Sequence, residues 1–206
     1  MLDLSVRRRI DPVLDRIGAA LAARGVGADG VTLAGFAIGV LAAVAIATES
    51  YVLGLVLVVA SRLCDGLDGA VARATRPTDF GGLLDIVLDF AFYGFVPLAF
   101  VLADPQQNAI AGAVLLVTFY VNGASFLAFA LMVEKRGVDA KGRGRKAFLY
   151  TVGLVEGTET ILFFCVLCLV PALFAPLAYA FAALTIATTL ARLALAWTTF
   201  RDGATP

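Results

Sequence analysis

The sequence of 206 residues contains no histidine, and charged residues make up only 16% of it. Without histidine the commonest general base and the commonest transition-metal ligand are excluded, so acid–base chemistry must fall to carboxylates, lysine or tyrosine. So little charge excludes an ordinary soluble domain, because 61% of the residues are apolar and the mean hydropathy is +0.92. The net charge is zero, and no nucleic-acid partner is expected.

Cysteine is scarce as well. The three cysteines are Cys64, Cys165 and Cys168, and the last two form a C-x-x-C pair inside an apolar run. Thiols in apolar surroundings act as small hydrophobic groups and are chemically inert. We therefore expect neither a redox centre nor a metal site at this pair.

Long apolar segments are what the sequence does contain. Six of them reach the length that spans a bilayer, which predicts an all-α integral membrane protein with six transmembrane helices. Their approximate limits are 31–48, 51–74, 82–103, 109–133, 147–170 and 173–200. Since no stretch is polar enough for a separate soluble domain, residues 1–206 are expected to form a single membrane domain, with the six-helix bundle over 31–200.

Residues 1–25 mix arginines with apolar side chains. No apolar segment follows the basic cluster at once, as a signal peptide would require. The pattern predicts an amphipathic helix on the membrane surface, with its arginines near anionic lipid headgroups. A loosely ordered basic leader is the alternative.

Among the connections between the spans, lysine and arginine occur in one set only. They lie in the N-terminal segment, at Arg73 and Arg76, in the segment 135–146 and at Arg201. The opposite connections, near residues 49, 105 and 171, contain none. Under the positive-inside rule, both termini and the loops after the second and fourth spans face the cytoplasm.

Four aspartates lie inside or at the ends of two predicted spans. The second span ends with Asp65 and Asp68, and the third opens with Asp85 and Asp89. Spacings of three and four residues place each pair on one helix face, and the short connection makes the two spans antiparallel neighbours, so the acidic faces can meet. Intramembrane charges of this kind indicate a functional site.

Four facing carboxylates cannot all stay ionised without cations. Hard oxygen ligands suit Mg²⁺ or Mn²⁺, so we predict two divalent ions and a two-metal phosphoryl-transfer site at the cytoplasmic side. The alternative is a buried ion network with Arg62 and Arg73, which would leave two negative charges uncompensated.

The aspartates belong to a longer pattern. Asp65-x2-Asp68-Gly69-x2-Ala72-Arg73-x7-Gly81-x3-Asp85-x3-Asp89 resembles the signature of the CDP-alcohol phosphotransferase (CDP-alcohol phosphatidyltransferase) family. The resemblance covers nearly the whole chain, which also looks similar to the YnjF-type bacterial inner-membrane members. It implies an enzyme that moves a phosphatidyl group from CDP-diacylglycerol to an alcohol acceptor, releases CMP, and works among membrane lipids, often as a homodimer.

The resemblance also implies roles for the matched residues. Asp65, Asp68 and Asp85 would ligate the two metal ions, and Asp89 would both touch a metal and act as the general base on the acceptor hydroxyl. Contacts to the cytidine nucleotide would come from Gly69, Ala72, Arg73 and Gly81. Small residues let a ligand approach the backbone closely, and an arginine fork suits a phosphate.

A turn ahead of the first span carries two further nucleotide candidates. The family often has Pro-Asn-x-x-Thr where this chain has Ala28-Asp29-Gly30-Val31-Thr32. Asp29 keeps an acceptor for the cytosine amine, so Asp29 and Thr32 are candidate nucleotide contacts. Plain N-capping of the helix by Asp29 is the alternative.

The acceptor site is indicated by charges near the last two spans. The candidates are Glu156, Glu159, Arg192, Arg143, Arg145 and Lys146. The two glutamates could bind a hydroxyl or an amine, or could pair with the arginine of the sixth span. A phosphorylated acceptor would use the basic loop, although those residues also satisfy the positive-inside rule without a ligand. Carboxylates without an arginine cluster on span five favour an acceptor with free hydroxyls or an amine.

Two other classes of membrane protein use acidic clusters. A prenyltransferase acting on a diphosphate lipid also needs aspartates and Mg²⁺, but typically in DDxxD-like clusters that this pattern does not match. A non-catalytic cation-binding protein, such as a channel, would need a continuous polar path through the bilayer. The outer halves of these spans are strongly apolar, which disfavours that class.

Overall fold

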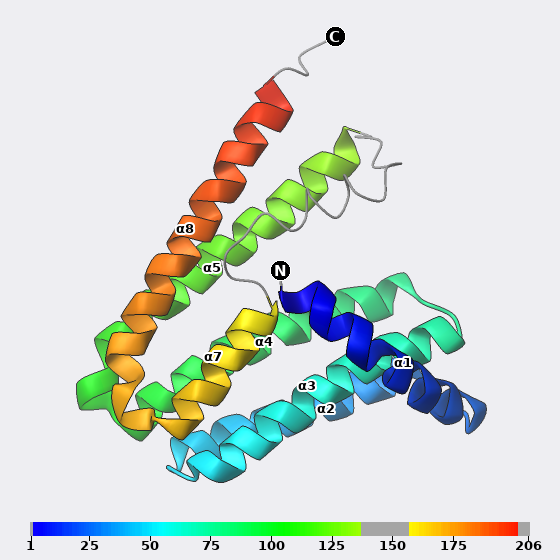
Figure 1. Ribbon diagram of the computed structural model, residues 1–206, viewed down its shortest axis with the longest axis horizontal. Coiled ribbons are helices and arrows are strands. Elements are labelled where there is room, and N and C mark those ends of the chain that lie inside the picture. Colours follow the sequence, from blue (N-terminus) through cyan, green and yellow to red (C-terminus); the bar gives the residue numbers. More distant parts are fainter. Residues whose placement is uncertain (1, 137–156, 202–206) are drawn as a thin grey trace.

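A computed structural model describes residues 2–136 and 157–201, and every regular element in these ranges is helical. The elements are α1 (Leu2–Ala23), α2 (Ala28–Ala47), α3 (Tyr51–Ala74), α4 (Asp79–Ala103), α5 (Pro105–Lys135), α7 (Gly157–Leu169), a short 3₁₀ turn (Pro171–Leu173) and α8 (Phe174–Arg201). The all-α prediction is therefore confirmed for the described residues (Figure 1).

Four of these elements are long and apolar enough to cross a membrane. They are α2, α4, α5 and the segment Pro171–Phe200 that contains α8. Helix α3 is long enough at 24 residues, but its apolar character is interrupted from its middle onward by Arg62, Asp65, Asp68 and Arg73. Helix α7 has only 13 residues, and the first part of the predicted fifth span, residues 147–156, lies outside the described ranges.

The helix limits follow from local chemistry at the connections. Thr78 caps α4, because its side-chain oxygen accepts a hydrogen bond from the Gly81 N–H at 3.0 Å. Asp104 caps α5 in the same way through the Gln107 N–H at 3.1 Å, and Pro105 occupies the first helical position. Gly25 turns the chain out of α1 with a φ of +81°, a value that favours glycine.

The start of α2 decides the alternative in which Asp29 is only a helix cap. The N-cap is Gly27, which offers no side-chain hydrogen bond, and Asp29 lies in the first turn of the helix. The alternative of plain N-capping is therefore wrong, and the Asp29 carboxylate is left to another role.

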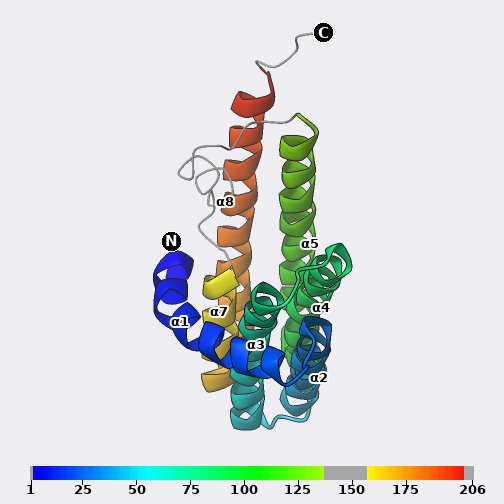
Figure 2. The same cartoon turned by 90° about the vertical axis from the view of Figure 1, so that its right-hand side faces the viewer.

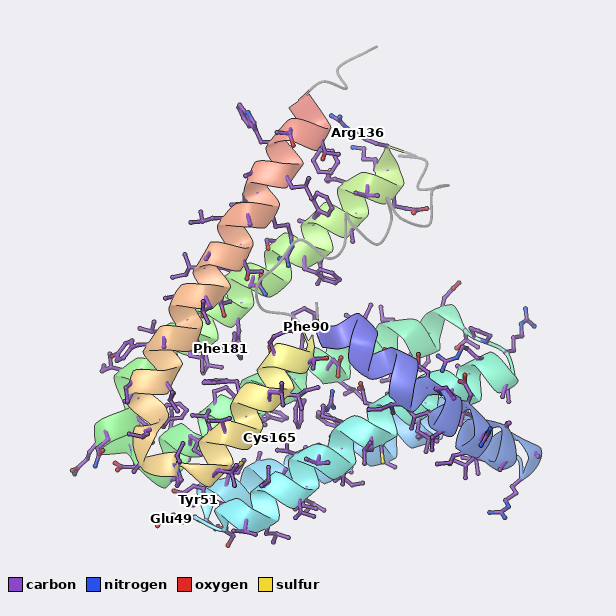
Figure 3. The ribbon with its side chains drawn as sticks, viewed as in Figure 1. Glu49, Tyr51, Phe90, Arg136, Cys165 and Phe181 are labelled. Atoms are coloured by element: carbon purple, nitrogen blue, oxygen red, sulfur yellow. The ribbon has the colours of Figure 1, made fainter. Side chains whose placement is uncertain are left out.

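The helices form two arms joined at one end. Helices α2, α3 and α4 lie together, with α1 across α3, whereas α5 and α8 run as a long pair away from them (Figures 1 and 2). Helix α7 packs against α3 near the junction. Glu49 and Tyr51 mark the end where α2 turns into α3 (Figure 3). Arg136 marks the end of the α5–α8 arm that lies away from the junction of the two arms.

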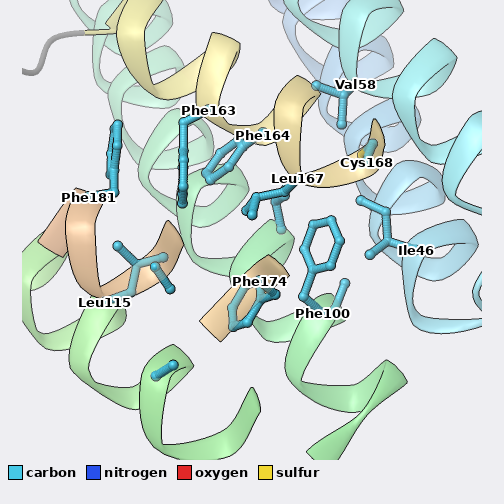
Figure 4. Close-up of a cluster of buried hydrophobic side chains, with 14 of the residues drawn as sticks. Ile46, Val58, Phe100, Leu115, Phe163, Phe164, Leu167, Cys168, Phe174 and Phe181 are labelled. Atoms are coloured by element: carbon cyan, nitrogen blue, oxygen red, sulfur yellow. The ribbon is translucent and has the colours of Figure 1, made fainter. Parts of the chain in front are cut away.

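An aromatic core closes the junction between the arms. Phe100 stacks on Phe174 with ring centroids 5.3 Å apart, and Phe163 stacks on Phe181 at 4.0 Å (Figure 4). Cys168 is buried within this cluster, where it acts as one more apolar side chain. The core thus fixes α4, α7 and α8 relative to one another.

Helix α1 is ordered as a helix, not as a loose leader. Its Gly18 is buried against α3, while Ile10, Val13 and Ile17 remain exposed. A Cβ atom at Gly18 would lie 2.8 Å from both the carbonyl carbon and the Cβ of Ala70. Because the neighbour is backbone, it cannot move aside, and α1 sits close to α3 only because residue 18 has no side chain.

Replacing Gly18 with leucine is therefore expected to loosen α1 from α3. Overpacking of this kind costs about 1–3 kcal/mol of unfolding free energy. Thermal unfolding and protease accessibility of the N-terminal segment in detergent measure the effect. Ala20→Leu on an exposed position of the same helix is the matched control, and equal behaviour of the two variants would contradict this packing role.

Candidate functional site

Three of the four aspartates meet where α3 and α4 adjoin. One carboxylate oxygen from each of Asp65, Asp85 and Asp89 lies within 4.8 Å of the others. Helices α3 and α4 pack mainly on α2 and hardly on each other, so the aspartate side chains of the two helices meet beside α2. Such a spacing is compatible with oxygen ligands around one divalent cation.

Asp68 lies apart from this group. It is only 6% exposed, and its Oδ2 atom is buried without a hydrogen-bond partner. A buried, unpaired carboxylate oxygen is costly unless a cation or donor joins it. With three clustered carboxylates and no histidine or thiolate beside them, this orphaned oxygen fits a site for hard divalent cations.

A small cavity lies beside the cluster. Its volume is about 10 Å³, the space of a single water molecule. The lining residues are Thr32, Gly35, Phe36, Arg62, Asp65, Asp85, Leu88 and Asp89. All but one of the carboxylates in the sequence pattern thus surround a space of ionic size.

Arg62 enters this cluster from α3. Its Nη1 donates to Asp65 Oδ1 at 3.2 Å and to Asp89 Oδ1 at 2.5 Å. The ion network considered as an alternative is thus present for Arg62, but not for Arg73. Arg73 instead donates to Asp15 of α1 at 2.7 Å, and both side chains are more than half exposed.

A larger pocket adjoins the carboxylates. It has a volume of about 430 Å³ and lies between the start of α2, the end of α3 and the start of α4. It is lined by Gly27, Ala28, Asp29, Thr32, Asp68, Gly69, Ala72, Thr75, Arg76, Pro77, Thr78, Gly81, Gly82 and Asp85. Thr32 and Asp85 line both cavities, so the larger pocket leads to the acidic cluster.

Most of the nucleotide candidates gather around this pocket. Asp29, Thr32, Gly69, Ala72 and Gly81 all line it, although they come from three helices. Arg73 does not, because it points to α1.

The connection between α3 and α4 lines one side of the larger pocket, and the sequence analysis did not predict this. Its residues Thr75, Arg76, Pro77 and Thr78 line the pocket, so Arg76 is the arginine placed there. The only sequence signal for these residues was their position between the two halves of the acidic pattern.

The described candidates for the acceptor site, Arg192 and Glu159, line neither of the two cavities. Arg192 is buried, and its Nη1 donates to the Asn122 carbonyl at 3.0 Å, to Asn122 Oδ1 at 2.8 Å and to Ser125 Oγ at 2.6 Å. These bonds tie α8 to α5. Glu159 lies half-buried in the first turn of α7. Glu156, Arg143, Arg145 and Lys146 lie outside the described residues.

The start of α7 lies close to the Tyr93 side chain of α4. A Cβ atom at Gly157 would lie 3.6 Å from the Tyr93 hydroxyl. Tyr93 is one helical turn beyond Asp89 on α4. The α7 segment that carries Glu159 therefore begins beside the turn of α4 that follows the candidate base.

Comparison with known proteins gives a consistent picture. The model of the CDP-alcohol phosphatidyltransferase family matches residues 25–199. The inner membrane protein YnjF of Escherichia coli K12 is 50% identical over 192 residues, which is 93% of each chain. The archaetidylinositol phosphate synthase of Methanothermobacter thermautotrophicus is 46% identical over 85 residues, or 41% of this chain and 40% of that protein.

A solved structure shares the fold. It is the phosphatidylinositol phosphate synthase PgsA1 of Mycobacterium tuberculosis with CDP-DAG bound, with a TM-score of 0.72. The likeness covers 91% of this chain and 94% of that one, at 24% sequence identity. The two-armed arrangement of helices is therefore also found in a solved structure.

Proposed function

Because the chain belongs to the CDP-alcohol phosphatidyltransferase family, we propose that it moves a phosphatidyl group from CDP-diacylglycerol to an alcohol and releases CMP. The observation that carries the proposal is the junction of two cavities. A pocket lined by all the nucleotide candidates except Arg73 leads, through Thr32 and Asp85, to the cluster of Asp65, Asp85 and Asp89. The solved relative with CDP-DAG bound supports the same donor.

The nucleotide and the acyl chains of CDP-diacylglycerol require different environments. The nucleotide is polar and would enter the pocket of about 430 Å³, whereas the acyl chains need an apolar environment. Exposed apolar side chains surround the start of α4, including Phe80, Leu83 and Val87. We place the acyl chains against such lipid-facing surface, with the pyrophosphate between the two at the carboxylates.

The metal part of the proposal rests on the donor set. Asp65, Asp68, Asp85 and Asp89 would hold two divalent ions, Mg²⁺ or Mn²⁺. When bound, such ions neutralise the pyrophosphate charge and make CMP a better leaving group. Asp89 takes the proton from the acceptor hydroxyl as that oxygen attacks the lipid-side phosphorus. Asp29 and Thr32 orient the nucleotide, while Gly69, Ala72 and Gly81 leave it room.

The membrane arrangement is proposed from charge and length. Six spans would be built on α2, α3, α4, α5, the segment ending in α7, and α8, with α1 on the membrane surface. The basic ends, including Arg73 and Arg76, would face the cytoplasm. A bacterial inner membrane is supported by the similarity to YnjF, and the resemblance to the family suggests a homodimer.

The acceptor is proposed to carry free hydroxyls or an amine. Helix α7 offers Glu159, and the Arg192 Nη1 group is engaged with Asn122 and Ser125 of α5. Two similar proteins are named as synthases of inositol phosphate lipids, so inositol phosphate belongs among the alcohols to be compared.

The decisive experiment supplies labelled CDP-diacylglycerol with Mg²⁺ or Mn²⁺ and a panel of alcohols to the purified protein in detergent. Glycerol 3-phosphate, inositol phosphate, serine and phosphatidylglycerol form the panel, and CMP is measured. CMP release that depends on one alcohol is the expected result. Folded protein that releases no CMP with any alcohol would overturn the proposal, and pyrophosphate release would indicate a prenyltransferase.

Alanine at Gly81 is expected to weaken nucleotide binding. Its Cβ atom would lie 2.8 Å from Asp29 Oδ1 and 3.0 Å from Thr78 Oγ1, so the Asp29 side chain must move. One added methyl group in a fitted pocket changes affinity by about 10- to 200-fold. Calorimetric titration with CMP measures the loss. Gly94→Ala, on the same helix with nothing within 4 Å, is the control, and equal CMP affinity in both variants would exclude this role.

A further inference from the structure

We propose that Arg62 is the internal counter-ion of the carboxylate cluster: it holds Asp65 and Asp89 together in the metal-free site and competes with the divalent cations. The inference rests on the metal part of the proposed function. Arg62 lies outside the sequence pattern, which begins at Asp65. Its role is that of a positioning residue, because it acts through the carboxylates.

The position of Arg62 is set by two helices. It precedes Asp65 by three residues, so both side chains lie on one face of α3. Asp89 reaches the same guanidinium from α4, 27 residues further along the chain. The arginine side chain is only 9% exposed. Two of the three carboxylates that could hold a metal are therefore already paired with one cation.

Neighbouring groups hold the guanidinium in place. Its Nη2 donates to Ser61 Oγ at 3.3 Å, and that hydroxyl donates to the Gly35 carbonyl at 2.8 Å. The guanidinium carbon also lies 4.0 Å from the centroid of the Phe92 ring, which favours a cation over its face. Groups of α3 and α4 thus contact this side chain directly, and α2 supports it through Ser61.

One donor of the Arg62 side chain remains unpaired in this arrangement. The Arg62 Nε atom is buried without a hydrogen-bond partner, which is unfavourable for a donor. The side chain leaves that donor unpaired while it reaches both carboxylates.

The positive charge of Arg62 has two opposite effects, one on the stability of the fold and one on the affinity for metal ions. Clustered carboxylates repel one another strongly when poorly hydrated, so a buried cation between them stabilises the metal-free fold. The same positive charge repels an arriving divalent ion and lowers the affinity of the site. Arg62 thus sets how much metal is needed to fill the site and keeps the empty site folded.

Arg62→Met tests both the effect on stability and the effect on metal affinity, because methionine is apolar and can still pack on Phe92. Without metal, in EDTA, the unfolding temperature is expected to fall by more than about 5 °C. The affinity for Mn²⁺, measured by electron paramagnetic resonance, is expected to rise about tenfold, or about 1.4 kcal/mol. The rise in unfolding temperature on adding Mn²⁺ should be larger than in the wild type.

Two matched variants control for charge and for packing. Arg136→Met also removes one positive charge and one contact to an aromatic ring, since the Arg136 guanidinium lies 5.3 Å from the Phe200 centroid, but it is remote from the site and should leave Mn²⁺ affinity unchanged. Arg62→Lys keeps the charge without the fork, so its Mn²⁺ affinity should stay near that of the wild type.

The outcomes separate this inference from the proposed function. If no variant binds Mn²⁺, the proposed metal site fails. If wild type and Arg62→Met bind Mn²⁺ equally, or the variant binds it more weakly, only the role of Arg62 is overturned. If Arg62→Met is unfolded without metal, its recovery in Mn²⁺ supports the proposal, and failure to recover overturns it.

Discussion

Asp89→Asn is expected to lower the rate of CMP release by about 10²- to 10⁴-fold, because an amide cannot take the proton of the acceptor hydroxyl. The amide oxygen can still accept the hydrogen bond that Arg62 donates to Asp89 Oδ1, so the fold should persist. Asp89 does not line the larger pocket, and CMP affinity should therefore stay close to that of the wild type. A discontinuous CMP assay and a CMP titration measure the two quantities.

The Asp89→Asn experiment must distinguish the loss of a general base from the loss of a metal ligand, since Asp89 is proposed to be both. Turnover that stays low at every Mn²⁺ concentration indicates the base, whereas recovery at high Mn²⁺ indicates a ligand alone. Asp79→Asn removes the same charge from an exposed position of α4 outside both cavities and should change neither quantity. Near-normal turnover of Asp89→Asn would exclude Asp89 as the base.

Asp68→Asn is expected to change stability and turnover in opposite directions. The Asp68 carboxylate is buried and its Oδ2 lacks a partner, so removing its charge should leave the metal-free protein as stable as the wild type or more stable. A lost metal ligand removes several kcal/mol of transition-state stabilisation, which corresponds to at least about a 10²-fold loss of turnover.

Thermal unfolding in EDTA and CMP release in Mg²⁺ test the two halves of this prediction. Asp104→Asn is the matched control, because asparagine caps a helix as well as aspartate does and Asp104 caps α5 away from both cavities. A destabilised Asp68→Asn protein with normal turnover would show that the residue is structural and not a metal ligand.

Much of the fold could be predicted from apolar length. The second predicted span, 51–74, has the limits of α3, and the predicted limits 82–103 and 173–200 lie within three residues of α4 and α8. Such limits are local, because they depend on where polar and capping residues interrupt an apolar run. The alternative that Asp29 caps α2 was wrong, because Gly27, which has no side-chain hydrogen bond, is the N-cap of that helix.

The approach of the acidic faces could also be predicted. Spacings of three and four residues fix which side of each helix is acidic. The expectation that α3 and α4 pack directly on each other is not met, because both pack mainly on α2. The carboxylates of Asp65, Asp85 and Asp89 nevertheless lie within 4.8 Å of one another. The structure places Asp68 toward the larger pocket instead, a division within the quartet that spacing alone could not give.

By itself, the sequence determined the helical class, most helix limits, the acidic residues and most of the residues that line the larger pocket, because these depend on periodicity and local spacing. Only the tertiary structure decided the partners of the arginines. Arg73 bonds Asp15 across 58 residues, Arg62 bonds Asp89 across 27, and Arg192 bonds Asn122 across 70. Such pairings depend on how each helix is rotated and tilted against its neighbours, and apolar periodicity defines a face too broadly to fix that rotation.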